Sequence, residues 1–151
     1  MSQTLVFNSI HLIWSTKNRT PWLRNNTIRE RLHSYLAGIA NRLDSTPYQI
    51  GGVEDHVHLY CSLSKNIALK DLVLNLKKDS SKWIKVEYPE LSDFSWQAGY
   101  GGFSISHSHG QILKEYILNQ EVHHKKMTFQ EEFREICKKN HVQIDEQYVW
   151  D

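Results

Sequence analysis

The sequence contains few cysteines, no long apolar run and almost no excess charge of either sign. Its two cysteines, Cys61 and Cys137, are too few and too unpatterned for a disulfide framework, which predicts a reducing, cytoplasmic environment. The longest apolar runs are far shorter than the ~20 residues that a membrane-spanning helix needs. The opening residues Met1–Thr4 include no basic segment, so we expect no secretory signal peptide. These absences predict a cytoplasmic protein that does not contact a membrane.

The near balance of charge also limits the function. A net charge of +1 argues against wholesale coating of nucleic acid, because proteins that coat it carry a strong excess of Lys and Arg. The distribution of charge is less even than its sum: lysines crowd residues 70–85, and acidic residues gather between 131 and 146. On composition alone, the lysine-rich segment is typical of a solvated helix face.

The chain has the length of one domain, and we expect a single domain over residues 1–151. Hydrophobic periodicity predicts strands over residues 5–14, 47–53, 57–63 and 96–106, and helices from Thr27 to about 43, from 69 to about 84 after a cap at Asn66, from 108 to 123, and from Thr128. This βαββαβ order with additional C-terminal helices predicts an α+β fold of the ferredoxin-like, split-βαβ type with an antiparallel sheet.

In that plan the first and third strands lie in the middle of the sheet. Side chains alternate along a strand, so Val57, Leu59 and Cys61 form the core face of the third strand. His56, His58 and Tyr60 then lie on the opposite face, which the two crossover helices leave open. The helix over 108–123 is the available cover, from the same chain or from a neighbour.

The segment His56-Val57-His58 presents two imidazoles on one strand face. Two neighbouring imidazoles can hold a divalent metal, although such a pair is more often half-buried packing. On the later helix, Tyr116 and Gln120 are four residues apart and therefore share a face. A phenol beside an amide oxygen can supply a nucleophile and a further metal ligand, or it can be an interface tyrosine beside a solvated amide.

Four segments together carry a resemblance to a known family. They are residues 11–19 (HLIWSTKNR), 51–59 (GGVEDHVHL), 99–106 (GYGGFSIS) and 116–124 (YILNQEVHH). They resemble, in order and at matching spacing, the motifs of the single-tyrosine HUH transposases, whose relatives include proteins associated with repeated extragenic palindromes. The resemblance extends over almost the whole chain and predicts one HUH transposase-like domain.

The resemblance implies a function and a set of site residues. Tyr116 would be the catalytic nucleophile, and His56, His58 and Gln120 would hold a divalent metal, Mg²⁺ or Mn²⁺. The enzyme would cleave single-stranded DNA through a 5′-phosphotyrosine, release a 3′-hydroxyl and rejoin the strands. Family members recognise hairpins at the ends of the element and work as homodimers, which implies composite active sites in which one subunit's tyrosine helix completes the other's metal site.

The proposed chemistry explains why such residues are needed. A phosphodiester repels nucleophiles, and a metal held by imidazole and oxygen ligands would polarise it beside Tyr116. A covalent phosphotyrosine keeps the bond energy, so the break can be resealed without an external energy source. Candidate DNA contacts are the following basic residues: Lys17 and Arg19 in the loop after the first strand, and Lys77, Lys78 and Lys82 in the second helix.

Two other functions fit part of the sequence. One is a non-catalytic or domesticated nucleic-acid-binding regulator, and the other is a metal-dependent nuclease that uses water instead of Tyr116. A second His-x-His, His107 and His109, lies at a strand-to-helix junction where the rings need not converge. His123 and His124 are interpreted as residues that cap or flank a helix end, where the helix dipole favours them.

Overall fold

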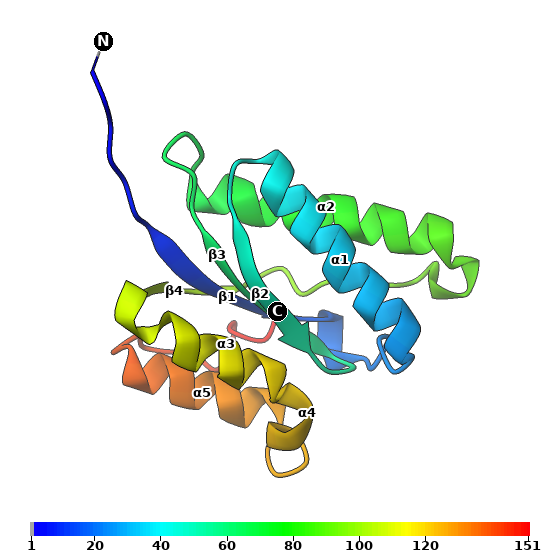
Figure 1. Cartoon of the computed structure of the whole chain (residues 1–151). Helices are drawn as coiled ribbons and strands as arrows, with labels where there is room; N and C mark the ends of the chain where they lie inside the picture. The colour runs from blue at the N-terminus through cyan, green and yellow to red at the C-terminus, as the bar shows by residue number, and fades with distance from the viewer. Residues whose placement is uncertain (1) are drawn as a thin grey trace.

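A four-stranded antiparallel sheet in the order β2-β3-β1-β4 forms the centre of the protein (Figure 1). The computed structural model describes residues 2–151. The strands are β1 (Ser9–Ser15), β2 (Pro47–Gly52), β3 (His56–Ser62) and β4 (Gly101–Ile105). The first and third strands are therefore the central pair, and β3 lies mid-sheet, as the sequence predicts.

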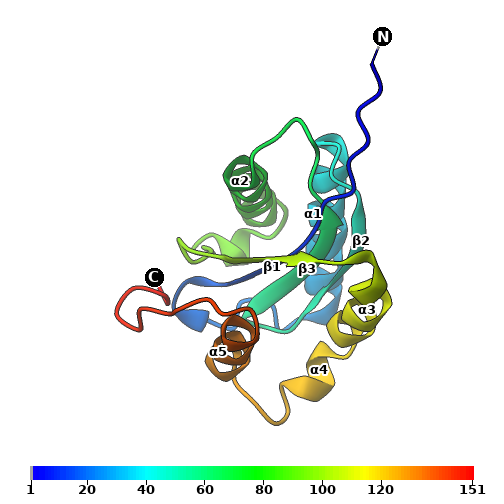
Figure 2. The same ribbon diagram turned by 90° about the vertical axis from the view of Figure 1, so that its left-hand side faces the viewer.

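Helices cover both faces of the sheet (Figure 2). The crossover helices α1 (Asn26–Arg42) and α2 (Leu69–Glu87) pack on one face. The C-terminal helices α3 (Gly110–Leu118), α4 (Gln120–His123) and α5 (Phe129–Lys139) lie on the other. Short 3₁₀ turns, η1 (Lys17–Arg19), η2 (Pro89–Leu91) and η3 (His107–His109), follow β1, α2 and β4. This arrangement confirms the split-βαβ α+β fold with additional C-terminal helices.

The main hydrophobic core lies between the sheet and the pair α1 and α2. Leu12 and Trp14 of β1, with Leu59 of β3, are fully buried there, and α1 and α2 contribute leucines such as Leu36 and Leu76. Each buried leucine contributes about 1.5–3 kcal/mol relative to an exposed one. Because alternate residues of each strand enter this core, the intervening residues, including His56 and His58, must face the C-terminal helices.

Several predicted boundaries are wrong. The first strand begins at Ser9 instead of residue 5, and the apolar residues 5–7 before it are exposed because no neighbouring strand pairs with them. Helix α1 is capped by the Asn25 side chain, which accepts a hydrogen bond from the Ile28 amide, and not by Thr27. Helix α2 follows Ala68 and has no side-chain cap, so Asn66 does not cap it. The last helix does begin with the predicted capping box at Thr128.

The predicted helix over 108–123 is two helices in the structure. It breaks at Asn119, whose φ and ψ of −95° and 19° end α3 before α4 begins. Two glycines allow the covering helices to approach the sheet closely. A Cβ on Gly51 of β2 would lie 2.5 Å from the Ile117 carbonyl oxygen of α3, and one on Gly101 of β4 would lie 2.5 Å from the Phe133 ring of α5. Glycine at these positions therefore sets the distance between the sheet and α3 and α5.

None of the helices described within residues 2–151 combines the length and the apolar character needed to cross a membrane.

Candidate metal and tyrosine site

Strand β3 places its two histidines side by side under the C-terminal helices. His56 and His58 are both fully buried, and their ring centroids lie 5.2 Å apart. His58 pairs with Ile13 of β1 on one side and with Gly51 of β2 on the other. The expected convergence of the two rings on one face is therefore present, on a central strand that is paired on both sides.

Helices α3 and α4 bring Tyr116 and Gln120 to these histidines within one chain. The Gln120 side chain is buried, and its Oε1 lies 3.0 Å from Nε2 of His56. The Tyr116 ring packs edge-on to His58, with centroids 5.8 Å apart. All four residues predicted from the sequence are thus neighbours, although the break at Asn119 means that one continuous helix does not carry both. The composite site predicted from the resemblance is not needed to assemble them, because one chain does so.

A glutamate from α5, which the sequence reasoning missed, lies at the centre of this group. Glu132 is 1% exposed, and its Oε1 lies 3.2 Å from His56 Nε2, 3.0 Å from His58 Nε2 and 3.1 Å from His124 Nε2. Its other oxygen, Oε2, accepts hydrogen bonds from the Gln120 amide at 2.9 Å and from the Tyr116 hydroxyl. One carboxylate therefore contacts the predicted nucleophile and all three predicted metal ligands.

His124 also belongs to the site, contrary to the interpretation that it only caps or flanks a helix. Its Nε2 contacts Glu132, and its Nδ1 donates to the Met127 carbonyl at 2.9 Å. The ligand atoms of His56, His58, His124 and Glu132 all lie within 4.8 Å of one another. His123 instead stacks on the Tyr116 ring, with centroids 4.6 Å apart. The turn after α4 therefore contributes to the site and does not simply end a helix.

The three imidazoles are held in place by partners on their far nitrogens. Nδ1 of His56 bonds the Asp55 carboxylate at 2.7 Å, and Nδ1 of His58 lies 2.8 Å from Nε2 of His11 on β1. Nδ1 of His124 is held by the Met127 carbonyl. Histidines that bind metals usually have their second nitrogen fixed in this way, which sets the tautomer and the ring orientation. All three Nε2 atoms are consequently directed at one point.

Burial and charge together shift the acid–base properties of the group. Burial lowers the pKa of His56, but its hydrogen bonds to Asp55 and Glu132 outweigh this and raise it to about 9. Burial raises the pKa of Glu132, yet the hydrogen bonds from His124, His56 and His58 hold it well below its usual range. Burial and the adjacent Glu132 carboxylate raise the pKa of the Tyr116 hydroxyl above its usual value. The carboxylate is therefore ionised, and the phenol keeps its proton in this state.

The predicted DNA-contacting residues fall into two groups. Lys17 and Arg19 lie in η1, next to Thr16, whose amide donates to the Asp55 carbonyl at 2.8 Å, so this loop adjoins the His56 end of β3. Lys17 is exposed, whereas the Arg19 guanidinium donates to the Trp150 carbonyl at 2.8 Å. That these two residues contact DNA stays a prediction.

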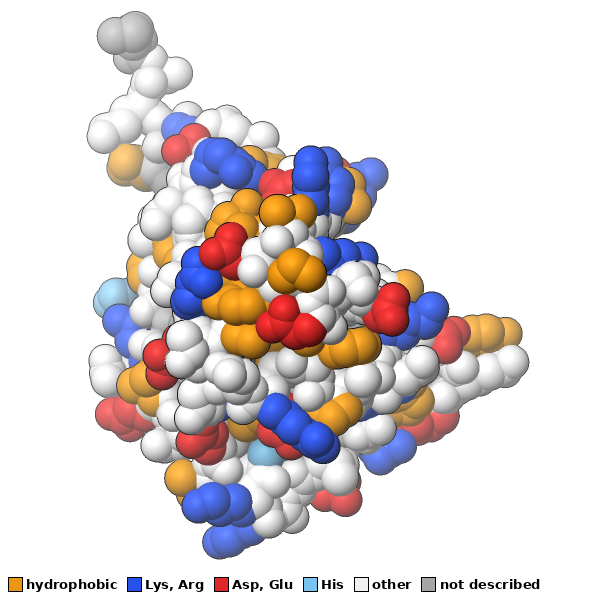
Figure 3. Space-filling view, turned by 90° about the vertical axis from the view of Figure 1, so that its right-hand side faces the viewer, with side chains coloured by type: hydrophobic (Ala, Val, Ile, Leu, Met, Phe, Trp, Pro, Cys, Tyr) orange, Lys and Arg blue, Asp and Glu red, His pale blue; other side chains and the backbone are white. Residues whose placement is uncertain are grey.

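The lysines of α2 lie on the opposite face of the sheet from the histidines. The Lys77 ammonium donates to the carbonyls of Gln97, Ala98 and Gly99, and burial lowers its pKa to about 8, which gives it a structural role. Lys78 and Lys82 are exposed on α2. Figure 3 shows Lys and Arg side chains interspersed with acidic ones instead of gathered in one stripe. The structure does not bring these lysines to the site.

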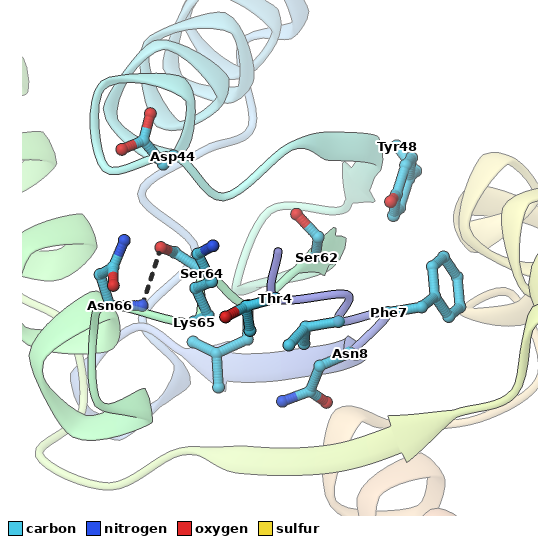
Figure 4. Close-up of a pocket in the computed structure, with 11 residues that line it drawn as sticks. Thr4, Phe7, Asn8, Asp44, Tyr48, Ser62, Ser64, Lys65 and Asn66 are labelled. Atoms are coloured by element: carbon cyan, nitrogen blue, oxygen red, sulfur yellow. Dashed lines mark hydrogen bonds between the residues drawn. The ribbon is translucent and has the colours of Figure 1, made fainter. Parts of the chain in front are cut away.

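A surface pocket of about 460 Å³ lies at the other end of β3 from His56 (Figure 4). Its walls include Phe7, Asp44, Tyr48 and Asn66, and the Asn66 amide donates to the Ser64 hydroxyl. The second His-x-His motif is also remote from the site: residues 107–109 form an exposed turn, in which His109 contacts the Ser106 hydroxyl. Neither feature adds to the convergent group around Glu132.

Comparison with known proteins agrees with this architecture. Residues 6–120 match the family model described as "Transposase IS200 like". The ISDra2 transposase TnpA of Deinococcus radiodurans is 30% identical over 117 residues, which cover 73% of this chain and 81% of the relative.

Two solved structures share the fold. One, a protein of Deinococcus radiodurans R1, has a TM-score of 0.64 at 24% identity and covers 80% of this chain and 96% of its own. The other, a REP-associated tyrosine transposase bound to a REP hairpin, has a TM-score of 0.60 at 15% identity, covering 82% of this chain and 74% of its own. With a family model that spans most of its length and a transposase relative at this identity, the chain belongs to the IS200-like transposase family.

Proposed function

We propose that this protein cleaves and rejoins single-stranded DNA through a covalent 5′-phosphotyrosine at Tyr116. The observation that supports it most is the convergence, within one chain, of the Tyr116 hydroxyl, the His56–His58 pair and Gln120 around one buried point. Membership of a transposase family makes strand cleavage the expected chemistry. A tyrosine beside potential metal ligands supplies the nucleophile that such chemistry needs.

Tyr116, whose hydroxyl is oriented by its hydrogen bond to Glu132 Oε2, would attack the scissile phosphorus and release its proton to solvent. A bond forms between the tyrosine oxygen and phosphorus, the bond from phosphorus to the 3′ oxygen breaks, and that oxygen takes up a proton to leave as a 3′-hydroxyl. Attack by a 3′-hydroxyl of another strand reverses these steps and rejoins the DNA. The phosphotyrosine carries the 5′ end of the downstream fragment throughout.

The donor set of the site fits a divalent cation, with His56, His58 and the Gln120 oxygen as its predicted holders. When bound there, Mg²⁺ or Mn²⁺ would polarise the scissile phosphate and offset its charge. The chain itself orients the ligands, through Asp55 and His11 on the far nitrogens of the imidazoles. It also keeps water away from the histidines, which are fully buried under α3 to α5.

The substrate that we propose is a single strand with a hairpin near the cleavage point. It is supported by the shared fold with a transposase whose structure contains a REP hairpin. Lys17 and Arg19 lie at the end of the sheet where His56 begins β3, which suits them for phosphate contacts beside the scissile bond. The DNA contacts of Lys78 and Lys82 would require a strand that wraps to the α2 face.

We also propose a homodimer, with each active site built within one chain. The outer sides of α3 and α4 expose Ile112, Leu118 and Val122, at 64%, 65% and 56%, which would suit contact with a second copy. Mixing a His56→Ala/His58→Ala chain with a Tyr116→Phe chain tests the construction. With sites built within one chain, the mixture stays inactive, whereas recovery of cleavage would indicate that helices are exchanged between subunits.

Trapping of the covalent adduct tests the proposed function. The full-length protein is incubated with Mn²⁺ and a hairpin-bearing single strand labelled at its 3′ end, then denatured and separated by electrophoresis. We expect the wild type to retain the label and to release a fragment that ends in a 3′-hydroxyl. Tyr116→Phe, which removes one oxygen from a half-buried ring, should fold normally and retain none, whereas Tyr148→Phe, at an exposed tyrosine, should behave as wild type.

The alternatives give different products in the same experiment. A nuclease that uses water would cut the DNA without an adduct and would survive the Tyr116→Phe change. A regulator without catalytic activity would shift the DNA in a binding gel and leave it intact. Peptide mapping of the adduct to a tyrosine other than Tyr116 would contradict the assignment.

A further inference from the structure

The contact of Glu132 Oε1 with three imidazoles is the feature of the site that the proposed function does not explain. Buried carboxylates are costly unless they are paired, and this one is buried among three imidazoles, an amide and a phenol. It lies on the apolar side of α5, between Phe129 and Phe133, where an apolar residue would otherwise pack. A residue placed in this way needs a partner that compensates its charge.

A count of donors and acceptors shows what is missing. The Asp55 carboxylate and the Met127 carbonyl can only accept, so Nδ1 of His56 and Nδ1 of His124 carry the protons of those contacts. A histidine binds a metal in its neutral form, and in that form the Nε2 atoms of these two imidazoles are bare acceptors. They face Glu132 Oε1, another acceptor, and Nε2 of His56 also faces the Gln120 oxygen. Several lone pairs therefore converge on one buried point, an arrangement that a cation satisfies.

The distances also fit shared coordination. Ligand atoms bonded at ~2.0–2.2 Å to one metal ion lie roughly 3–3.5 Å apart. The three separations from Glu132 Oε1 to the imidazole Nε2 atoms are 3.0 to 3.2 Å. The carboxylate thus occupies the position of a neighbouring ligand of the histidines, and its second oxygen stays bonded to Tyr116 and Gln120.

We infer that Glu132 and His124 are ligands of the same divalent cation as His56 and His58, so that the metal site is a three-histidine, one-glutamate centre in which Gln120 bonds the Glu132 carboxylate instead of the metal. Both added ligands follow residue 120, where the match to the family model ends, so they come from the C-terminal segment of this chain. The inference rests on the proposed function only in that it concerns the same site. Glu132 would then hold the metal through Oε1 and position the Tyr116 hydroxyl through Oε2.

This ligand set has a consequence for the choice of metal. Three imidazole nitrogens and one carboxylate suit Mn²⁺, Co²⁺ or Zn²⁺, whereas Mg²⁺ prefers oxygen ligands and retains its water molecules. We therefore expect the metal-free protein to bind Mn²⁺ or Zn²⁺ more tightly than Mg²⁺. Of the two ions that the resemblance implies, Mg²⁺ and Mn²⁺, this ligand set would favour Mn²⁺.

Titration of metal into the full chain without DNA tests the inference. The protein is stripped with a chelator, and Mn²⁺ binding is followed by calorimetry and by the shift of the melting temperature. Glu132→Gln keeps the size of the side chain but loses the charge, and it should lower Mn²⁺ affinity at least ~10-fold. Loss of a residue that only hydrogen-bonds a metal ligand already lowers affinity by about this factor. Glu135→Gln, an exposed change on the same helix, is the matched control and should bind as wild type.

A second variant protects the test against misfolding. His124→Gln changes a half-buried residue in the turn before α5 and should also lower Mn²⁺ affinity at least ~10-fold. With Co²⁺ as the probe, both variants should alter the visible absorption spectrum, because that spectrum reports a change of ligand. Mn²⁺ binding by folded Glu132→Gln that equals or exceeds wild type would overturn the inference, and would mean that Glu132 only fills the site.

The outcomes separate this inference from the proposed function. Because the titration contains no DNA, unchanged metal binding by Glu132→Gln would leave tyrosine chemistry at Tyr116 intact. Conversely, the wild type could bind Mn²⁺ and give no DNA adduct, while both variants bind Mn²⁺ more weakly. That result would support the four-ligand metal centre and contradict the proposed reaction. Absence of any divalent-metal binding by the wild type would contradict the four-ligand centre directly.

Discussion

The two faces of the sheet are built from alternate residues of the same strands, and around the first half of β3 they differ in chemistry, although the α3–α5 face also holds smaller apolar clusters. Towards α1 and α2, β3 presents Val57, Leu59 and Cys61 to an apolar core. Towards α3 to α5, it presents His56 and His58 to a carboxylate, an amide and a phenol. Both faces exclude water equally, since these residues are all fully buried.

The difference shows how burial serves two purposes in one strand. On the α1–α2 face, burial of apolar groups stabilises the fold. On the α3–α5 face, burial strengthens the interactions of a polar network whose members must all find partners. The apolar face makes the sheet rigid, and that rigidity holds the two imidazoles at fixed separation. The two faces should therefore respond to substitution in opposite ways.

The largest effect is expected from His58→Ala on the α3–α5 face. It should lower the rate of DNA cleavage at least ~100-fold. Loss of a residue that only hydrogen-bonds a metal ligand can already lower activity by that factor. Stability should fall by about 1–3 kcal/mol for each buried group left without its partner, here His11 and Glu132. Cleavage is measured per mole of folded protein, with exposed His107→Ala as the control. Cleavage within a few-fold of wild type would remove the distinction between the faces.

Leu59→Ala on the other face should have the reverse effect. Leu59 is fully buried in the main core, and a leucine-to-alanine change at such a site lowers the free energy of unfolding by ~2–5 kcal/mol. Cleavage per mole of folded protein should stay near wild type, because the residue points away from the histidines. Urea unfolding and the adduct assay give the two quantities. A large loss of specific activity would mean that the apolar face also sets the site geometry.

Much of this arrangement could be predicted from the sequence, because alternation decides it. The apolar pattern of β3 assigned its core face and placed His56 and His58 opposite, and the order of elements predicted both the plan and the central position of the strand. The same alternation in β1 contains a further signal. With Leu12 and Trp14 in the core, His11 had to face the site, where it bonds His58.

The remaining site residues could not be placed in this way, because they depend on how the C-terminal segment folds back. Glu132 lies at a position of α5 where the apolar stripe of Phe129, Phe133 and Cys137 leads one to expect an apolar side chain. A charge on such a stripe is a usable signal of a buried function. His124 gave no comparable signal, because a histidine at a helix end is ordinarily explained by the helix dipole.

A histidine on the other side of the sheet sharpens the comparison through pH. Burial, with a smaller contribution from Arg29, lowers the pKa of His33 in α1 from 6.5 to about 4. The folded protein therefore resists protonation that the unfolded chain accepts. The stability that neutral His33 confers is complete above pH 6.5 and is lost as the pH falls through 4, at no more than ~1.4 kcal/mol per pH unit.

Urea unfolding between pH 7 and pH 4.5 measures this effect. We expect the wild type to lose more stability over that interval than His33→Gln, whose side chain does not titrate there. Equal losses by the two proteins would mean that protonation of His33 does not lower the free energy of unfolding, as is expected of a histidine beside a carboxylate. The contrast with the paired histidines under α5 would then disappear.

The smallest expected effect concerns where DNA passes over the molecule. Lys17 is exposed in the loop that adjoins Asp55 and His56, whereas Lys78 is exposed on α2, on the other face of the sheet. Each phosphate contact on a single strand contributes a slope of about 0.7 in log affinity against log salt concentration. Lys17→Gln should therefore reduce the slope by about that amount and weaken binding several-fold at low salt, while Lys78→Gln should change neither. Fluorescence anisotropy of a hairpin-bearing single strand at several salt concentrations gives both slopes. If Lys78→Gln reduced the slope as much as Lys17→Gln, the DNA strand would have to contact both faces of the protein. The difference between the two faces of the sheet would then hold in the interior of the protein but not at its surface.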